Sequence, residues 1–321
     1  MKRILLLLLI LLIGGMPVSA AKRNKKKRKG QITYTSKECI NAFITRMNAN
    51  AKQFGMTNTT FKNASGWAAE GHISCASDML RMLMAATTYD KLMHYWGWEQ
   101  YSINVMGYEP REVVVKSTYK GAKAVDLGTH YDIYGGKSGS WYHGKNRGAS
   151  KNLVCAVKSK VDNQWLIGCV MGAGKSGRFV AMRQLLDWLE AKRVDPTTPE
   201  PELDCKHAAA TVLPLHSGMA YRDKDIVMVG KDFDTLYAPY SMTKVMTAMI
   251  ALDYCKPDEI ITIIEDDIVG GSGPKLQYGD KLTMEDALIA LMLPSSNTLA
   301  KTISRYVGEK ILRIQQEGLS R

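Results

Sequence analysis

Apolar residues recur at helical spacing along several stretches of the chain. In residues 36–54 they fall on one stripe, which predicts an amphipathic helix. A second helix is predicted over residues 77–86, with Ser77 as its N-cap. The same pattern predicts further helices over residues 179–192, 241–254, 283–293 and 298–307. Residues 241–254 are apolar on almost every side, so we expect this helix to be buried.

Strand-like runs lie between these helices. Residues 112–116, 153–158 and 165–171 are rich in β-branched and other apolar side chains. A polar turn joins the last two runs, which is typical of a β-hairpin. Two further short runs flank residues 221–223. Because strands and helices do not alternate regularly, the pattern predicts an α+β fold.

Residues 194–204 form the clearest linker in the chain, because they hold three prolines and show no apolar periodicity. They separate a first half over residues 36–193 from a second half over residues 205–308, which a C-terminal tail at 309–321 follows. A chain of 321 residues is long enough for one large domain or two small ones.

The first 20 residues have the pattern of a secretory signal peptide. A basic start at Lys2-Arg3 precedes an unbroken apolar run over residues 4–13, and small residues at 18–20 supply a cleavage site. The apolar run is too short to span a bilayer comfortably, and an uncleaved anchor is the alternative. We therefore expect an exported protein of the periplasm or cell envelope.

The formal net charge of +12 is concentrated near the N-terminus. Residues 22–29 hold seven basic side chains, within a basic linker over residues 21–35. The remainder is only mildly basic, so the composition does not indicate a nucleic-acid-binding face. The basic arm either attaches to an anionic envelope or membrane surface or serves as a solvated spacer.

Six cysteines occur, and none forms a C-x-x-C pair or has a histidine at zinc-ligand spacing. Export permits disulfides. Cys155 and Cys169, however, lie in apolar strand-like runs, where buried free thiols are expected. The sequence leaves the pairing open.

A serine and a lysine at the start of the predicted buried helix are the first candidate for chemistry. Ser241-x-x-Lys244 places the two side chains one turn apart on the same helix face. Burial favours the neutral form of the Lys244 amine. A neutral amine beside a hydroxyl can take its proton and activate it as a nucleophile. The alternative is an N-cap serine followed by a lysine whose charge reaches solvent.

A second motif, Ser295-x-Asn297, lies between two predicted helices. A loop there can present both side chains to a substrate. Ser295 would relay a proton to the leaving group, and Asn297 would bind a substrate amide. The alternative is simple turn chemistry, since proline, serine and asparagine favour turns.

A third motif, Lys137-Ser138-Gly139, precedes the predicted hairpin and so falls on an edge strand. Lys137 would bind a substrate carboxylate and help to position the serine of the second motif. Gly139 would let the substrate backbone approach closely. The backbone N–H groups of Ser241 and Ser140 would form an oxyanion hole. The alternative is a loop lysine.

Together the three motifs match the set found in penicillin-binding proteins and β-lactamases. The sequence around them resembles the low-molecular-mass penicillin-binding D-alanyl-D-alanine carboxypeptidases, which are serine peptidases of the SxxK type. The similar segments are residues 47–67, 72–84, 137–188, 238–254 and 282–300. The resemblance therefore covers most of the chain between residues 36 and 308.

This resemblance implies a β-lactamase/transpeptidase-like fold, with helices and a helical subdomain flanking an antiparallel sheet. It implies a D-Ala-D-Ala carboxypeptidase that acts on peptidoglycan stem peptides through a serine acyl-enzyme, that β-lactam antibiotics inhibit, and that uses no metal or organic cofactor. The implied catalytic residues are Ser241, Lys244 and Ser295, and the implied substrate-binding residues are Asn297, Lys137, Ser138, Gly139 and Ser140. Ser138 replaces the threonine that is usual in the family and keeps its hydroxyl.

The motif order departs from the family. There SxxK comes first, then SxN, then KTG, whereas here Lys137 precedes Ser241 and Ser295. Circular permutation accounts for this order if the usual mid-chain is cut between residues 307–308 and residues 36–37. Lys137 should then meet Ser241, and residues 308 and 36 should lie close together. The competing account is two half-domains that complete each other between chains, as in domain swapping.

Other functions fit parts of the sequence. Residues 172–176 resemble a P-loop between a strand and a helix, which would make the protein a nucleotide hydrolase, but Cys169 stands where the first glycine belongs. A catalytically weak or inactive muropeptide-binding relative, or a DD-endopeptidase, would keep the same three motifs. A β-lactamase would share the fold, but no segment resembles its deacylating glutamate region.

Overall fold

The computed structural model describes residues 33–119, 125–142, 149–213 and 226–318. Residues 34–321 form one compact unit. The predicted signal peptide and nearly all of the basic linker lie outside the described residues. Within the described ranges, no helix is both long and apolar enough to cross a membrane.

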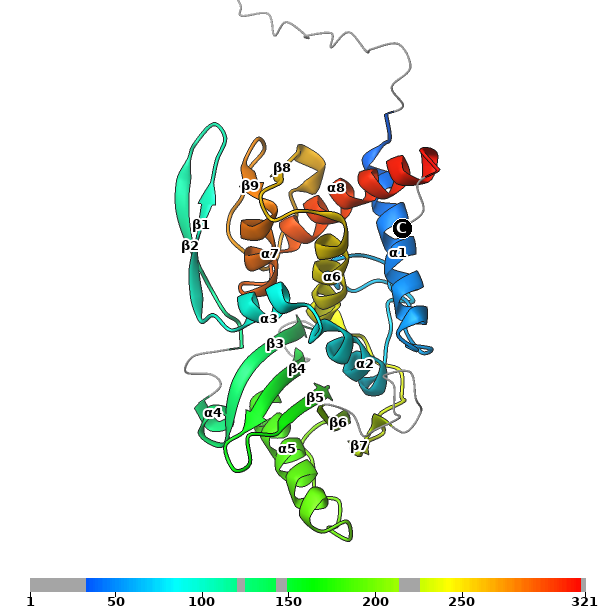
Figure 1. The fold of residues 1–321 in the computed structure, drawn as a ribbon, viewed down its shortest axis with the longest axis vertical. Coiled ribbons are helices and arrows are strands. Elements are labelled where there is room, and N and C mark those ends of the chain that lie inside the picture. The colour runs from blue at the N-terminus through cyan, green and yellow to red at the C-terminus, as the bar shows by residue number, and fades with distance from the viewer. Residues whose placement is uncertain (1–32, 120–124, 143–148, 214–225, 319–321) are drawn as a thin grey trace, which may run out of the picture. The chain divides into compact units, whose positions relative to one another are not determined.

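A five-stranded antiparallel sheet organises this unit, in the order β3-β4-β5-β6-β7 (Figure 1). The strands are β3 Tyr131–Tyr142, β4 Ala149–Ser159, β5 Trp165–Met171, β6 His207–Leu213 and β7 Val229–Lys231. The hairpin that the sequence predicts is formed by β4 and β5. β3 lies at one edge of the sheet, as expected for the strand that carries Lys137. The α+β class is confirmed.

β5 separates two apolar cores, because successive side chains of a strand point to opposite faces. Ile167 and Cys169 belong to one core, and Leu166 and Val170 belong to the other. Helix α2, Ala76–Ala86, packs against β5 within the first core. Helix α5, Arg178–Val194, covers the opposite face. A strand buried on both faces explains why residues 165–171 are continuously apolar.

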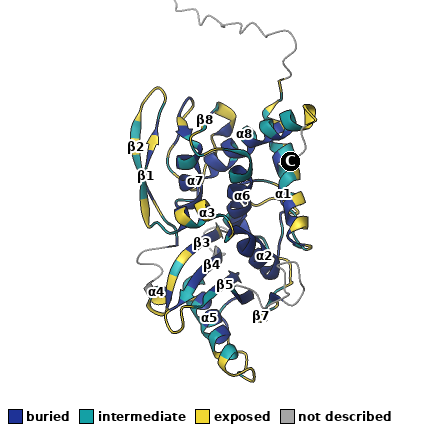
Figure 2. Cartoon of the chain, viewed as in Figure 1, coloured by how far each residue is buried: buried dark blue, intermediate teal, exposed yellow. Residues whose placement is uncertain are grey.

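A helical layer lies against the α2 side of the sheet (Figure 1). It contains α1 Ser36–Gln53, α3 Asp90–Trp96, α6 Lys244–Tyr254, α7 Met284–Met292 and α8 Asn297–Gln316. α6 forms the dark blue centre of Figure 2, and every residue from 244 to 251 is buried. The expectation of a buried helix here is confirmed.

α8 packs along α1, and the two helices cross closely at a glycine. A Cβ atom added to Gly308 would lie 1.8 Å from the carbonyl oxygen of Cys39. The start of α1 therefore lies beside the stretch of α8 around residue 308. α8 continues to Gln316, so residues 309–316 are helical rather than the start of a tail.

The sequence pattern did not predict two short helices, α3 and α4 Val125–His130, and it did not predict most of two small sheets. These sheets are the hairpin of β1 Gln100–Val105 and β2 Arg111–Lys116, and the pair of β8 Ile260–Thr262 and β9 Lys281–Thr283. Only the β2 part of the hairpin was expected. A salt bridge of 2.6 Å between Arg111 and Asp280 ties this hairpin to the loop before β9.

Two local expectations were wrong, and the cysteine question is answered. Ser77 is not the N-cap of α2, because Cys75 holds that position and the Ser77 hydroxyl donates to the carboxylate of Asp234. The helix expected from residue 241 begins as a 3₁₀ turn over Tyr240–Thr243, and α6 starts at Lys244. All six cysteines are unpaired, and five of them are buried.

Candidate active site

Ser241 lies in the 3₁₀ turn that leads into α6, and Lys244 is the first residue of α6. Tyr240 before it has a left-handed backbone with φ of 49°. Such a backbone is unfavourable for a bulky residue and is held only where the surrounding structure fixes it. The turn leaves Ser241 partly exposed, while the side chain of Lys244 is completely buried.

The amine of Lys244 contacts three oxygen atoms. It donates to the Ser65 carbonyl at 2.7 Å and to Oδ1 of Asn297 at 2.8 Å, and its Nζ lies 3.0 Å from Oγ of Ser241. Burial, reinforced by the nearby charge of Lys137, holds the pKa of Lys244 well below its ordinary value. A neutral amine has two N–H groups and one lone pair. Because the two carbonyl-type oxygens accept both N–H groups, the lone pair is free to take the proton of the Ser241 hydroxyl.

Lys137 reaches the second motif from β3. Its Nζ donates to Oγ of Ser295 at 2.9 Å and to the carbonyl of Ser138 at 3.1 Å. Burial, with a smaller effect from the charge of Arg178, lowers the pKa of Lys137 to about 7. Ser295 lies in the turn between α7 and α8 with a left-handed φ of 68°. The amine can therefore exchange a proton with this hydroxyl near neutral pH.

β3 and the Ser241 turn touch at Gly139. A Cβ atom at this position would lie 2.7 Å from the carbonyl oxygen of Pro239 and 3.4 Å from the backbone nitrogen of Ser241. Only glycine permits this approach. The Ser138 hydroxyl pairs with the Thr118 hydroxyl at 2.8 Å. One chain thus brings all three motifs together, and Lys137 lies near Ser241 as the rotated motif order requires.

Arg178 belongs to this site, although the sequence did not single it out. Its guanidinium donates to the carbonyls of Gly139 at 3.0 Å and Asn152 at 2.9 Å, and to Oγ of Ser140 at 2.6 Å. Burial lowers its pKa, and no ion pair with an acidic residue is present among the described side chains. A cation in the first turn of a helix opposes the helix dipole. That misplaced charge at the start of α5 is the sequence signal that could have identified it.

The loop after α1 supplies a further part of the site, the carbonyl of Ser65. Asn63 orders the loop by accepting from the N–H groups of Gly66 at 2.8 Å and Trp67 at 3.0 Å. This places the Ser65 carbonyl against Lys244. No motif marks a backbone carbonyl, so this contact could not be found from the sequence.

His72 fixes the turn that carries Ser241 by a hydrogen bond to Thr243. Its Nδ1 accepts from the Lys62 N–H at 3.1 Å, so its Nε2 carries the proton and donates to the Thr243 hydroxyl at 2.9 Å. Burial, with a smaller effect from Lys62, lowers the pKa of His72 to about 4. The ring is therefore neutral at physiological pH and holds Thr243 in place. His72 therefore has a structural role in this site.

The P-loop interpretation is wrong. Residues 172–177 do link β5 to α5, but the Asp204 carboxylate occupies the turn. It accepts from the Ser176 N–H at 2.7 Å and from the Ser176 hydroxyl, while the Gly174 N–H donates to the Asp204 carbonyl at 2.9 Å. A P-loop uses such N–H groups to hold anionic phosphate. A carboxylate in that place would repel it.

The antiparallel sheet, its flanking helices and the serine–lysine pair define a protein of the β-lactamase-like fold class. Comparison with known families agrees. A family model described as D-alanyl-D-alanine carboxypeptidase matches residues 38–175 of this chain. The matched stretch contains Lys137 and ends before Ser241.

A curated relative is similar to this chain over a shorter region. The D-alanyl-D-alanine carboxypeptidase DacF of Bacillus subtilis (strain 168) is 40% identical over 60 residues, which is 18% of this chain and 15% of that protein. No solved structure was found to match the chain.

Proposed function

We propose that the protein is a serine-type D-Ala-D-Ala carboxypeptidase that acts on peptidoglycan stem peptides. The observation that carries this proposal is the buried Lys244 amine, whose N–H groups are taken by Ser65 and Asn297 and whose lone pair faces Ser241. Such an amine is a general base beside a nucleophile. The family match over residues 38–175 supports the substrate class.

In the proposed reaction, Ser241 Oγ attacks the carbonyl carbon of the penultimate D-Ala while Lys244 takes its proton. The backbone N–H groups of Ser241 and Ser140 hold the oxyanion, with each donor contributing roughly 3 kcal/mol. Ser295, supplied with a proton by Lys137, protonates the departing D-Ala amine. The proton on Lys244 then passes to the neutral Lys137, which restores both amines. Water attacks the acyl-enzyme ester while Lys244 takes its proton, and that proton returns to Ser241 Oγ as the ester bond breaks.

The terminal carboxylate of the substrate needs cations and hydroxyl groups near β3. Lys137 supplies a cation and Ser138 supplies a hydroxyl, as the motif suggests. Arg178 adds a guanidinium with no acidic partner among the described residues, two residues along β3 at Ser140. We assign carboxylate binding to this set.

Covalent labelling of Ser241 tests the proposal. A fluorescent penicillin should label the native protein, D-Ala should be released from a D-Ala-D-Ala peptide, and Ser241→Ala should abolish both. Ser272→Ala is the matched control, because Ser272 also opens an S-x-x-K sequence but lies in an exposed loop. Labelling without D-Ala release would favour the DD-endopeptidase. Folded protein that takes no label would refute the proposal and favour the inactive muropeptide-binding relative.

We also propose that the chain is a circular permutant of the family. The proposal is supported by the contact of Gly308 with Cys39, which puts the expected cut sites side by side, and by the meeting of all three motifs within one chain. The irregular segment after α5 would then connect the usual ends of the family's chain.

Export to the periplasm or cell envelope is part of the same proposal. The peptidoglycan substrate lies outside the cytoplasm, and β-lactams would reach Ser241 there. The basic arm would hold the enzyme near an anionic membrane surface.

A further inference from the structure

Thr118 contacts the third motif, although it belongs to none of the three. It lies just after β2 and is half-buried, and its hydroxyl oxygen is 2.8 Å from that of Ser138. A hydroxyl has one proton to donate and two lone pairs that accept. Among the described residues, neither of these hydroxyls has another hydrogen-bond partner. The pair can therefore form with either hydroxyl as the donor.

A carboxylate bound at Ser138 fixes the direction of this hydrogen bond. An ionised carboxylate only accepts hydrogen bonds, so the Ser138 hydroxyl must give it the proton. Thr118 must then donate to the Ser138 oxygen, because no other proton lies between the two hydroxyls. A hydroxyl that accepts one hydrogen bond donates a stronger one, since the two bonds polarise each other. The Thr118 proton therefore strengthens the contact of Ser138 with a carboxylate.

The side chain of Ser138 has little else to hold its hydroxyl in place. Serine lacks the methyl branch that restricts χ1 of threonine, and its hydroxyl can occupy any of the staggered positions. Ser138 is buried, but the bond to Thr118 is the only hydrogen bond of its hydroxyl within the described part of the chain. Thr118 therefore selects the position of this hydroxyl.

Thr118 is itself fixed by the residue that follows it. Tyr119 is buried, and its hydroxyl donates to the Trp96 carbonyl at the end of α3. Its ring lies against β3, where a Cβ atom added to Gly136 would be 3.1 Å from a ring carbon. The backbone that carries Thr118 is thus fixed relative to the strand that carries Ser138.

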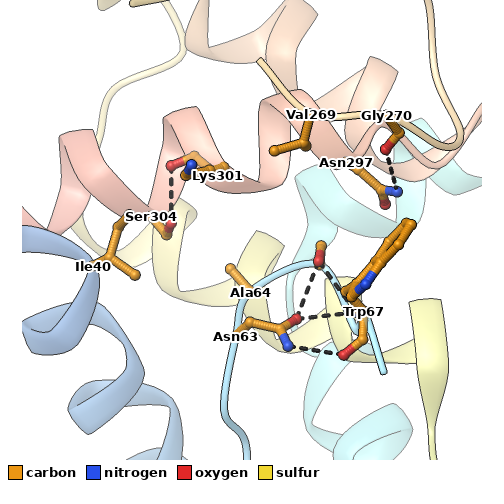
Figure 3. A pocket seen from close by; sticks show the side chains of 10 residues that line it. Ile40, Asn63, Ala64, Trp67, Val269, Gly270, Asn297, Lys301 and Ser304 are labelled. Carbon is orange, nitrogen blue, oxygen red and sulfur yellow. Dashed lines mark hydrogen bonds between the residues drawn. The ribbon is translucent and has the colours of Figure 1, made fainter. Parts of the chain in front are cut away.

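The backbone of Thr118 also reaches the second motif. Its N–H donates to the Leu293 carbonyl at 3.0 Å, at the end of α7 and two residues before Ser295. Beyond this turn, Nδ2 of Asn297 donates to the Gly270 carbonyl at 3.2 Å in the wall of a pocket (Figure 3). The turn is therefore held on both sides, and Thr118 joins it to β3.

Resting on the function proposed above, we infer that Thr118 is a positioning residue, which holds the Ser138 hydroxyl with its proton directed to the terminal carboxylate of the substrate. Thr118 acts through Ser138 and does not touch the substrate. Its effect is therefore confined to substrates that have this carboxylate. The effect also ends with acylation, because the carboxylate leaves with the first product.

Two thioester substrates separate a positioning role from a structural one. An N-acyl-D-Ala-thioglycolate keeps a terminal carboxylate, and its methyl ester lacks one. Thr118→Val keeps the shape of the side chain and removes the hydroxyl. It should lower kcat/KM about tenfold for the acid, which is the loss expected for one hydrogen bond to a charged group. For the methyl ester the change should be less than about twofold. Thr118→Ser, which restores the hydroxyl, should recover most of the loss.

A double-mutant cycle shows whether Thr118 acts through Ser138. In a Ser138→Ala background, Thr118→Val should change kcat/KM for the acid by less than about twofold. Thr87→Val is the matched control, because it removes another half-buried threonine hydroxyl, which donates to the Met84 carbonyl. It should leave the acid-to-ester ratio unchanged. Circular dichroism checks that each variant is folded, and Thr118→Ala takes the place of Thr118→Val if the valine variant is not.

The outcomes separate the two proposals. Equal losses for the acid and the methyl ester in Thr118→Val would overturn the role of Thr118. An undiminished loss in the Ser138→Ala background would do the same. Both results leave the function standing if the parent takes fluorescent penicillin at Ser241. A parent that takes no label and hydrolyses neither thioester would refute the function and this inference with it.

Discussion

At the scale of single residues, two buried lysines carry the proposed chemistry in opposite protonation states. Lys244 must be neutral to accept a proton, whereas Lys137 must be charged to attract a carboxylate and to supply a proton through Ser295. Burial alone would neutralise both amines. The two amines differ in degree: Lys137 keeps a pKa of about 7, whereas the pKa of Lys244 lies well below its ordinary value.

The pH dependence of kcat/KM should show both lysines, because this constant reports the free enzyme. On the acid side it should fall as Lys244 takes up a proton and ceases to be a base. On the alkaline side it should fall from about pH 7, as Lys137 loses its charge. Steady-state assays between about pH 5 and pH 9 would measure this pH profile of kcat/KM. A rate constant that stays level above pH 7 would contradict the role of Lys137.

Removing the Lys137 amine should stabilise the fold. Because its pKa falls from 10.5 to about 7 on folding, the unfolded chain binds more protons between these values. The buried amine therefore lowers the free energy of unfolding. This loss is complete below pH 7 and disappears as the pH rises toward 10.5. Lys137→Met should therefore raise the free energy of unfolding by a few kcal/mol at pH 6, and by less at pH 9. Urea denaturation at both pH values measures this, and a variant less stable than the parent at pH 6 would contradict it.

At the scale of elements, the crossing of α1 and α8 depends on one glycine. Gly308→Ala should force the helices apart, because the added Cβ overlaps the Cys39 backbone, and should cost about 3 kcal/mol of stability. Gly128→Ala in α4 is the control, since its Cβ meets nothing within 4 Å. Thermal melts of both variants would show the difference. Equal melting temperatures would mean that the helices do not pack as closely as described.

Elements with strong periodicity could be predicted from the sequence, and contacts between distant segments could not. β5 was expected over 165–171 and is found at Trp165–Met171, because polar residues on both sides of an apolar run mark where the strand begins and ends. The first residue of α6 was misplaced by three positions, because the 3₁₀ turn depends on the left-handed Tyr240. The β1 strand was missed although its apolar residues alternate.

The same distinction applies to the site. Ser241 and Lys244 are three residues apart, so their contact follows from a single helical turn. Arg178 and the Ser65 carbonyl come from segments far away in the sequence, and only the folded chain brings them to β3 and α6. Their side chains also lack a motif of their own.

At the scale of the whole molecule, the proposed rotation of the chain order can be reversed. A chain running from residue 203 to 308, then through a short Gly-Ser turn to residues 36–194, should fold and take the fluorescent penicillin at Ser241. The contact between Gly308 and Cys39 makes a short turn sufficient. Circular dichroism would confirm folding before labelling. A folded, rejoined chain that takes no label, beside a parent that does, would argue against permutation.

The position of β3 at the sheet edge has a consequence for how a peptide is read. An outermost strand pairs on one side only, so its other side offers a row of N–H and C=O groups to an incoming extended chain. A peptide that adds there as a sixth strand is held by its main chain, whatever its side chains are. Its register then decides which carbonyl stops in front of Ser241. The pockets on either side of that added strand then discriminate between peptides by their side chains.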